Sequence, residues 1–281
     1  MSCSYLPEPL NDPQVSSFGK KCNEEAWSYI WIYKRGENLT ASEEKCKIPI
    51  RKWLLNTAIL IPARLESKRF PRKMLADVGG IPLITHVYNK CSNLGYDVYV
   101  VTDSHEIAQT VPHHIITGHA KNGTERCAQA MQQLNYDKYI NVQGDMIDVT
   151  ENMIKAAEKR LNEYSVSTIY TNMTPEKQKD PNTVKMISNE DYAHWFCRAG
   201  LGYGFHHLGI YGYRKKSLSR GYRKNIADSY LEFDISKEEE IEKLEQLRWI
   251  QNGIKIGINY VDESCIEINT PEDLAEWKLL H

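Results

Sequence analysis

Short apolar runs that alternate with amphipathic segments constrain the fold of this chain more than any other feature. The runs at 58–61 and 97–102 have the length and apolar content of buried strands. Segment 82–94 follows the first run and carries apolar residues at helical spacing. Strands that alternate with helices form right-handed βαβ units around a parallel sheet. We therefore expect an α/β domain with a Rossmann-like, mostly parallel central sheet.

The pattern continues along the chain and then becomes less regular. Further strands are predicted at 115–117, 138–142, 165–170, 183–187, 208–213 and 255–260, and further helices at 106–111, 125–134, 151–164 and 237–250. A final helix is predicted to begin at Pro271, with Thr270 as its N-cap. Beyond residue 165 these elements predict a smaller α+β lobe.

Residues 1–55 lack this periodicity, so we divide the chain into an N-terminal extension, 1–55, and a main domain, 56–281. Trp27, Tyr29, Trp31 and Tyr33 alternate, and on a strand they would share one face. A short helix is the alternative. We expect this aromatic cluster to pack against the main domain or to cover a subunit contact.

The overall composition excludes several classes of function. A net charge of −2 argues against nucleic-acid binding, which needs a clustered cationic surface. No apolar run approaches the roughly 20 residues of a membrane helix, and the N-terminus does not have the pattern of a secretion signal. The seven cysteines form no CxxC pair, which is typical of reduced thiols and predicts a cytoplasmic protein.

Three polar segments follow predicted strands: the basic loop 64–73, the turn at 102–103 and the turn at 143–145. Ligands of such sheets bind beyond the carboxyl ends of the strands. The loop carries the cations Arg64, Lys68, Arg69, Arg72 and Lys73. One guanidinium group can bind two phosphate oxygens at once, so the loop predicts a polyphosphate site. A solvated basic loop is the alternative. Asp145 could hold Mg²⁺, or serve only as a turn residue.

The basic loop resembles a motif of the sugar nucleotidyltransferases that use CTP, and specifically that of the 3-deoxy-manno-octulosonate (KDO) cytidylyltransferases. The matching residues are Pro62, Ala63, Arg64, Ser67, Arg69, Pro71, Lys73 and Leu75. Sialic and pseudaminic acid cytidylyltransferases share part of this loop, so it does not choose the sugar. Segments 123–126, 141–145, 207–214, 244–248 and 269–274 also resemble the KDO enzymes. Ordered matches from 57 to 278 are more specific than any single motif.

The resemblance implies a Rossmann-like, GT-A-like nucleotidyltransferase whose smaller lobe serves dimerisation and sugar binding. Such an enzyme transfers CMP from CTP to the anomeric hydroxyl of KDO or a close relative, with Mg²⁺, and releases pyrophosphate. It also implies a homodimer and a product for lipopolysaccharide biosynthesis. Two alternatives stay open: another acid sugar (amino-KDO, sialic or pseudaminic acid), or a catalytically impaired homologue that binds nucleotide.

The resemblance also implies roles for individual residues. The catalytic residues would be Arg64, Arg69, Lys73 and Asp145. The nucleotide would contact Ala63, Arg64, Lys73, Gly123, Thr124 and Asp145. The sugar would contact Gln143, Arg198, His207, Tyr211, Glu245 and Gln246, and the metal would contact Asp145 and Asn269. From the residues alone, His207 could equally be a structural histidine, Tyr211 a core aromatic, and Glu245 with Arg248 a solvated pair.

Two departures from the family pattern concern the metal site. Met146 and Ile147 replace a glutamate and a proline, and Asn269 replaces an aspartate. An amide oxygen still coordinates Mg²⁺, with weaker attraction. Asp148 or Glu267 could supply the missing charge, and Glu267 would share the side of Asn269 on a strand. A retuned metal site, a different sugar and a loss of turnover are the three open outcomes.

Overall fold

The computed structural model describes residues 15–18, 29–34, 47–49, 56–67, 69–216 and 225–280. The chain divides into two compact units, Met1–Asn56 and Thr57–His281. In the first unit, an antiparallel sheet has the order β1 (Val15–Phe18), β2 (Tyr29–Lys34) and β3 (Lys47–Pro49). The strand predicted for the aromatic cluster is confirmed at 29–34, and Trp27 lies outside the described residues.

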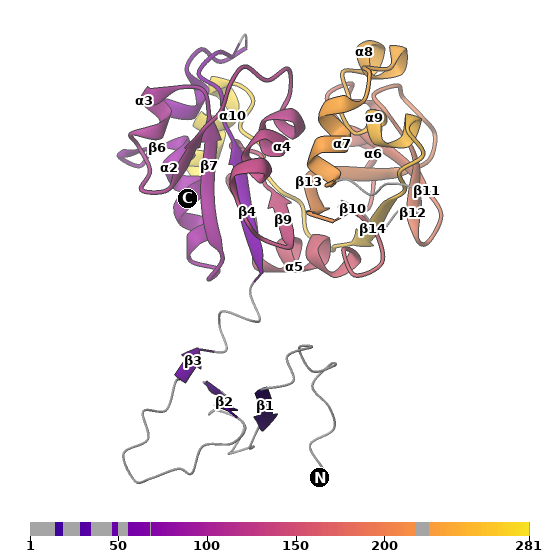
Figure 1. Ribbon diagram of the computed structural model, residues 1–281. Helices are drawn as coiled ribbons and strands as arrows, with labels where there is room; N and C mark the ends of the chain where they lie inside the picture. Colours follow the sequence, from indigo (N-terminus) through magenta and orange to yellow (C-terminus); the bar gives the residue numbers. More distant parts are fainter. Residues whose placement is uncertain are drawn as a thin grey trace. The chain divides into compact units, whose positions relative to one another are not determined.

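A nine-stranded sheet forms the framework of the described part of the second unit, in the order β10-β14-β12-β11-β13-β9-β4-β7-β8. Figure 1 shows β4 (Thr57–Pro62) between β7 (Asp97–Thr102) and β9 (Lys138–Asn141). These strands and β8 (His114–Ile116) pair in parallel. The other strands are β10 (Val166–Thr171), β11 (Lys185–Ser188), β12 (Tyr192–Cys197), β13 (Phe205–Arg214) and β14 (Ile256–Tyr260).

The sheet is mixed, so the prediction of a mostly parallel sheet is wrong beyond β9, although β10 and β14 pair in parallel there. β13 pairs antiparallel with β9, β10 and β11, and β12 pairs antiparallel with β11 and β14. Only residues 189–191 separate β11 from β12, which is too short for the crossover that parallel neighbours need. Sequence reasoning did not predict β12.

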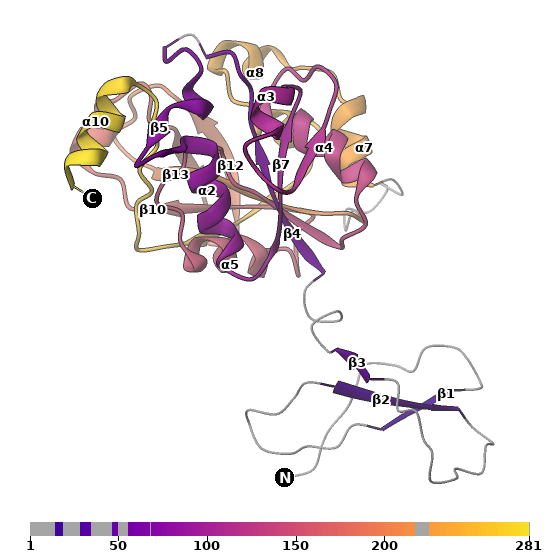
Figure 2. The same cartoon turned by 90° about the vertical axis from the view of Figure 1, so that its left-hand side faces the viewer.

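The helices cover both faces of the sheet. They are α2 (Leu83–Ser92), α3 (His105–Ala108), α4 (Gly123–Gln133), α5 (Glu151–Arg160), α6 (Pro175–Lys179), α7 (Ile226–Glu232), α8 (Lys237–Glu242), α9 (Leu247–Gln251) and α10 (Pro271–Leu280). Ile59 and Ile61 of β4 pack with α2 and α5, whereas Ala58 and Leu60 pack with α4 on the other face. Figure 2 shows these two layers around β4 and β7.

The charged segment 237–250 is not the single helix that its composition predicts. Lys243 has a φ of 56°, in the left-handed region, and it ends α8 before α9 begins at Leu247. A left-handed residue at this position stops helical hydrogen bonding. The break leaves Glu245 in a loop between the two helices.

The C-terminal helix returns to the first half of the domain. Thr270 caps it as predicted, with its Oγ1 3.2 Å from the backbone nitrogen of Asp273. The ring of Trp277 lies 5.4 Å from that of His86 on α2, and Figure 1 shows α10 beside α2. The chain also forms a hairpin of β5 (Asp77–Val78) and β6 (Ile81–Pro82), and a 3-10 turn at Lys73–Leu75. No helix in the described ranges has the length and apolar character to cross a bilayer.

Candidate active site

Lys73 and Asp145 meet where β4 and β9 end side by side. Lys73 Nζ lies 2.6 Å from Asp145 Oδ2, and Lys73 is only 8% exposed. A Cβ on Gly144 would lie 2.9 Å from Met74 Sδ and 3.3 Å from the backbone oxygen of Pro62. Glycine at 144 therefore allows the turn after β9 to approach the basic loop, so the loop and the carboxylate share one edge of the sheet.

Asn269 joins this pair from the C-terminal part of the chain. Its Oδ1 accepts a hydrogen bond from Arg69 at 3.2 Å and lies 3.5 Å from Lys73 Nζ. Arg69 also donates to Asn182 Oδ1 at 3.3 Å. Two cations of the basic loop therefore gather around one amide oxygen.

Ala63 and Arg64 begin the basic loop. The backbone nitrogen of Ala63 donates to Val101 O at 2.9 Å, which continues the pairing of β4 with β7 beyond the strand. Ala63 is buried and Arg64 is exposed. Arg64 therefore extends from the strand end into solvent, in contrast to the buried Lys73.

Glu267, rather than Asp148, is the second carboxylate beside Asp145. Residues Met146 and Glu267 form an antiparallel bridge, and Ile268 N donates to Asp145 O at 3.0 Å. Although water reaches the side chain, surrounding protein desolvates the carboxyl and raises the pKa of Glu267, and the charge of Asp145 raises it further. Asp148 is instead engaged by Lys90 and by the indole of Trp277, both at 3.3 Å.

The donor set of Asp145, Glu267 and Asn269 fits Mg²⁺. It offers two carboxylates and an amide oxygen, and Mg²⁺ favours few such ligands with phosphate and water completing its shell. Among the described residues, no group of three or more His, Cys, Asp or Glu side chains has the arrangement of a metal site. An ion held by these three side chains would have ligand positions left for phosphate and water.

His207 lies in the protein interior on β13. Its Nε2 is 2.8 Å from Thr168 Oγ1, and that hydroxyl donates to Ile210 O at 2.7 Å. Because the hydroxyl has one proton, His207 Nε2 must be the donor, which leaves Nδ1 as an acceptor. Burial lowers the pKa of His207 to about 3, assisted by His206 and Arg198, so the ring is neutral near pH 7.

Arg198 is held by two backbone oxygens. Its Nη1 donates to Asn182 O at 2.7 Å, and its Nε donates to Glu242 O at 3.2 Å. Asn182 therefore links Arg198 to Arg69, a connection that sequence reasoning missed. Pro181-Asn182 resembles the KDO enzymes, but the resemblance implied no role for Asn182, and an asparagine after a proline by itself predicts a turn.

The remaining predicted residues surround the first turn of α4. A Cβ on Gly123 would lie 3.3 Å from Gln143 Oε1, 3.4 Å from Pro62 Cγ and 3.6 Å from Glu245 Oε1. Gly123 thus brings the nucleotide and sugar candidates into one neighbourhood. Tyr211 and Gln246 are 4% and 2% exposed, so nearly all of each residue is buried in the protein.

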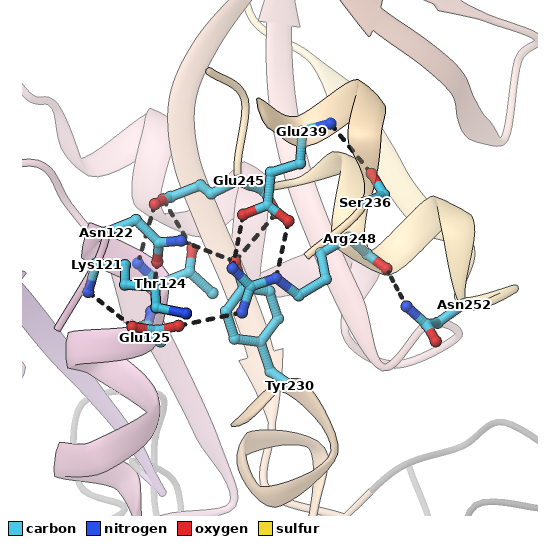
Figure 3. Close-up of polar contacts among 10 residues, drawn as sticks. All are labelled: Lys121, Asn122, Thr124, Glu125, Tyr230, Ser236, Glu239, Glu245, Arg248 and Asn252. Carbon is cyan, nitrogen blue, oxygen red and sulfur yellow. Dashed lines mark hydrogen bonds and ion pairs between the residues drawn. The ribbon is translucent and has the colours of Figure 1, made fainter. Parts of the chain in front are cut away.

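Glu245 and Arg248 are not the solvated pair that the charged segment allowed. Figure 3 shows Thr124 bonded to Glu245, and Arg248 between Glu239 and Glu125. Arg248 is 1% exposed and lies 2.6 Å from Glu239 Oε1 and 3.2 Å from Glu125 Oε1. The pairs are buried because α9 packs against α4 and the helices before it.

Replacing Arg248 by methionine is expected to cost about 3–5 kcal/mol of unfolding free energy, because it leaves the buried carboxylate of Glu239 without its cation. Urea denaturation measures this change. Lys278→Met is the matched control: its ion pair with Asp77 is exposed, so its loss is expected to cost less than about 1 kcal/mol. Equal effects of the two substitutions would contradict the assignment of a stabilising buried network.

Known proteins with similar sequences are cytidylyltransferases. The chain matches the family described as Cytidylyltransferase over residues 58–256. An 8-amino-3,8-dideoxy-manno-octulosonate cytidylyltransferase of Shewanella pealeana is 34% identical over 78% of this chain and 96% of its own length. The enzyme of the same name from Shewanella halifaxensis has the same identity and coverage.

Solved structures show the same relationship. The structure of CMP:2-keto-3-deoxy-manno-octonic acid synthetase complexed with CTP is 29% identical and has a TM-score of 0.71, over 80% of this chain and 97% of that one. The inositol-1-phosphate CTP transferase of T. maritima, at 16% identity and a TM-score of 0.56, shares the fold. It covers 80% of this chain and 94% of its own.

Proposed function

The chain belongs to the cytidylyltransferase family, and we propose that it transfers CMP from CTP to the anomeric hydroxyl of KDO or its 8-amino analogue, releasing pyrophosphate. The observation that carries the proposal is the contact between Lys73 and Asp145 at the ends of β4 and β9. It places a buried cation and a carboxylate at the edge of the sheet where nucleotides bind in folds of this class.

The reaction requires charge neutralisation more than covalent participation by the protein. The anomeric oxygen attacks the α-phosphorus of CTP, its hydroxyl proton passes to solvent, and the bond to the pyrophosphate breaks. Negative charge grows on the departing pyrophosphate, and positioned cations stabilise it. Lys73 and Arg69 are held at the site by Asp145 and Asn269, and Arg64 is exposed at the start of the same loop.

Magnesium is part of the proposal. Asp145, Glu267 and Asn269 would hold the ion, which when bound neutralises phosphate charge. Glu267 compensates for the amide at 269, because it brings a second carboxylate beside Asp145. This arrangement favours a retuned metal site over a loss of turnover.

The sugar side is proposed to include His207, Tyr211 and Gln143, with Arg198 facing the sugar carboxylate. A neutral His207 offers an acceptor to a hydroxyl group. The two sugars named for similar proteins are 8-amino-3,8-dideoxy-manno-octulosonate and 2-keto-3-deoxy-manno-octonic acid. We propose that the substrate is one of these two acids.

A panel assay tests the function. The pure protein is incubated with CTP, Mg²⁺ and either KDO, its 8-amino analogue or sialic acid, and pyrophosphate release and product mass are measured. A CMP adduct with KDO or its analogue, and none with sialic acid, is the expected result. Tight CTP binding without product from any acid would instead support a catalytically impaired nucleotide-binding protein.

Glu267→Gln is expected to raise the Mg²⁺ concentration needed for half-maximal CTP binding by about tenfold. This is the lower end of the loss in metal affinity that changes around a metal site cause. The reason is the loss of one of the two carboxylates. Adding Asn269→Asp to that variant is expected to restore the affinity, because it returns a carboxylate to the site. Asp148→Asn, which alters a carboxylate engaged by Lys90 and Trp277, is the matched control. Equal effects of Glu267→Gln and Asp148→Asn would contradict the metal assignment.

A further inference from the structure

The first turn of α4 lies at the sheet edge that carries the proposed nucleotide site. Gly123 approaches Pro62, where the basic loop begins, and Gln143, which follows β9. Asn122 caps the helix, because its Oδ1 accepts from Glu125 N at 2.8 Å. The position of this turn therefore decides how closely α4 can approach a nucleotide that is bound beyond β4 and β9.

A carboxylate from the other half of the domain holds this turn. Glu245 Oε1 accepts from Thr124 Oγ1 at 2.8 Å, and its Oε2 accepts from Thr124 N at 3.3 Å. Both carboxylate oxygens are thus directed at a single residue of α4. The 11-residue helix directs its positive end toward this carboxylate, which is a favourable arrangement.

Glu245 depends on these donors. Burial raises the pKa of its carboxyl, and the hydrogen bonds from Thr124 and Gly123 act in the opposite direction. The nearby guanidinium of Arg248 is bonded to Glu239 and Glu125 instead. The carboxylate of Glu245 is therefore compensated chiefly by the start of α4, and the start of α4 is in turn fixed by Glu245.

A second set of contacts supports the same turn. Arg248 donates to Glu125 Oε1 at 3.2 Å, and Glu125 Oε2 accepts from Lys121 N at 2.7 Å. Tyr230 donates to the backbone oxygen of Glu245 at 3.1 Å and accepts from Asn122 Nδ2 at 3.3 Å. Figure 3 shows Tyr230, Glu245 and Arg248 in contact with residues 121–125, and Arg248 bonded in turn to Glu239 of α8.

We propose that Glu245 is a positioning residue for the nucleotide: its carboxylate fixes the first turn of α4, so CTP affinity is set from the loop between α8 and α9. The inference rests on the proposed function in that CTP is the nucleotide. A role confined to sugar hydroxyls does not account for two bonds to Thr124. A role confined to sugar hydroxyls also predicts that a Glu245 variant has a raised KM for the sugar and an unchanged Kd for CTP.

The test is CTP binding without sugar, measured by calorimetry in the presence of Mg²⁺. Glu245→Gln keeps the side-chain volume but turns an amide NH₂ toward a donor of Thr124, and we expect the Kd for CTP to rise about tenfold, as for loss of a hydrogen bond to a charged group. Because the resemblance also implies a sugar contact for Glu245, the Kd for CTP measured without sugar is the readout that reports positioning. An unchanged Kd for CTP with a raised sugar KM would overturn the proposal.

Two controls separate positioning from general damage. Glu158→Gln neutralises the carboxylate that accepts from Thr57 Oγ1 at 2.6 Å at the opposite end of β4, and it is expected to leave CTP binding unchanged. Thr124→Val should weaken CTP binding, and the double variant with Glu245→Gln should be no weaker than Glu245→Gln alone, since coupled contacts are not additive. Additive losses would overturn the proposal.

Further outcomes distinguish this inference from the proposed function. Glu245→Asp keeps the charge but shortens the side chain that reaches Thr124, and it is also expected to raise the Kd for CTP, which keeps the proposal testable if Glu245→Gln does not fold. An unchanged Kd for CTP in Glu245→Asp would count against it. Failure of the unmodified protein to bind CTP would overturn the proposed function and this inference together. Normal binding by the unmodified protein and by Glu245→Gln would overturn the inference alone.

Discussion

Lys73→Met is expected to lower kcat for pyrophosphate release by about a thousandfold, the upper range for removing one positioned group that stabilises developing charge. The substitution removes a cation that is 8% exposed and leaves Asp145 without its partner at 2.6 Å. Steady-state kinetics with CTP and the active sugar measures the effect. Circular dichroism establishes that the variant is folded.

Lys90→Met is the matched control for this substitution. Lys90 also pairs with an aspartate, Asp148, at 3.3 Å, but on the side of the turn that faces Trp277. We expect its kcat to stay within about threefold of the unmodified value, as a surface ion pair contributes little. If Lys73→Met kept a comparable rate, the pyrophosphate would have to be stabilised elsewhere, and the assignment of Lys73 would be wrong.

Asp145→Asn is expected to have an effect of similar size, a loss of about a hundredfold to a thousandfold in kcat, because charge stabilisation in a site of this kind contributes several kcal/mol. The amide keeps the shape of the side chain but removes the charge that Lys73 and the metal ion require. Kinetics over a range of Mg²⁺ concentrations measures both the maximal rate and the ion dependence.

Asp103→Asn controls for a general effect at a strand end. Asp103 follows β7 and accepts from Arg126 at 2.8 Å. Like Asp145, it is an aspartate that pairs with a cation just beyond a strand next to β4. Its substitution is expected to leave the Mg²⁺ dependence unchanged. An Asp145→Asn variant with the unmodified rate and ion dependence would remove Asp145 from the proposed chemistry.

Much of the α/β organisation could be predicted because its signals are local. The apolar run at 58–61 and the capping of the last helix by Thr270 depend on neighbouring residues, and both have the predicted structure. The single helix predicted at 237–250 failed for the opposite reason. Its charges suit a helix, but the left-handed backbone at Lys243 ends α8, and Glu245 in the following loop bonds to Thr124 of α4.

The site residues also divide into those that local signals predicted and those that only the tertiary structure identified. Lys73 and Asp145 stood out because each follows a predicted strand, and parallel strands end at the same edge of a sheet. The sequence could not choose between Asp148 and Glu267 as the second carboxylate. The choice depended on which face of the turn each side chain occupies, and pairing of 266–268 with 145–147 placed Glu267 beside Asp145.

The sequence by itself determined the alternation of strands and helices, the basic loop after β4 and the carboxylate after β9, because periodicity and strand ends are properties of nearby residues. Only the tertiary structure decided that the sheet becomes mixed beyond β9, that Arg248 is buried between two glutamates, and that Glu245 holds the start of α4. These features join residues that are distant along the chain, and their geometry exists only once the strands and helices have packed.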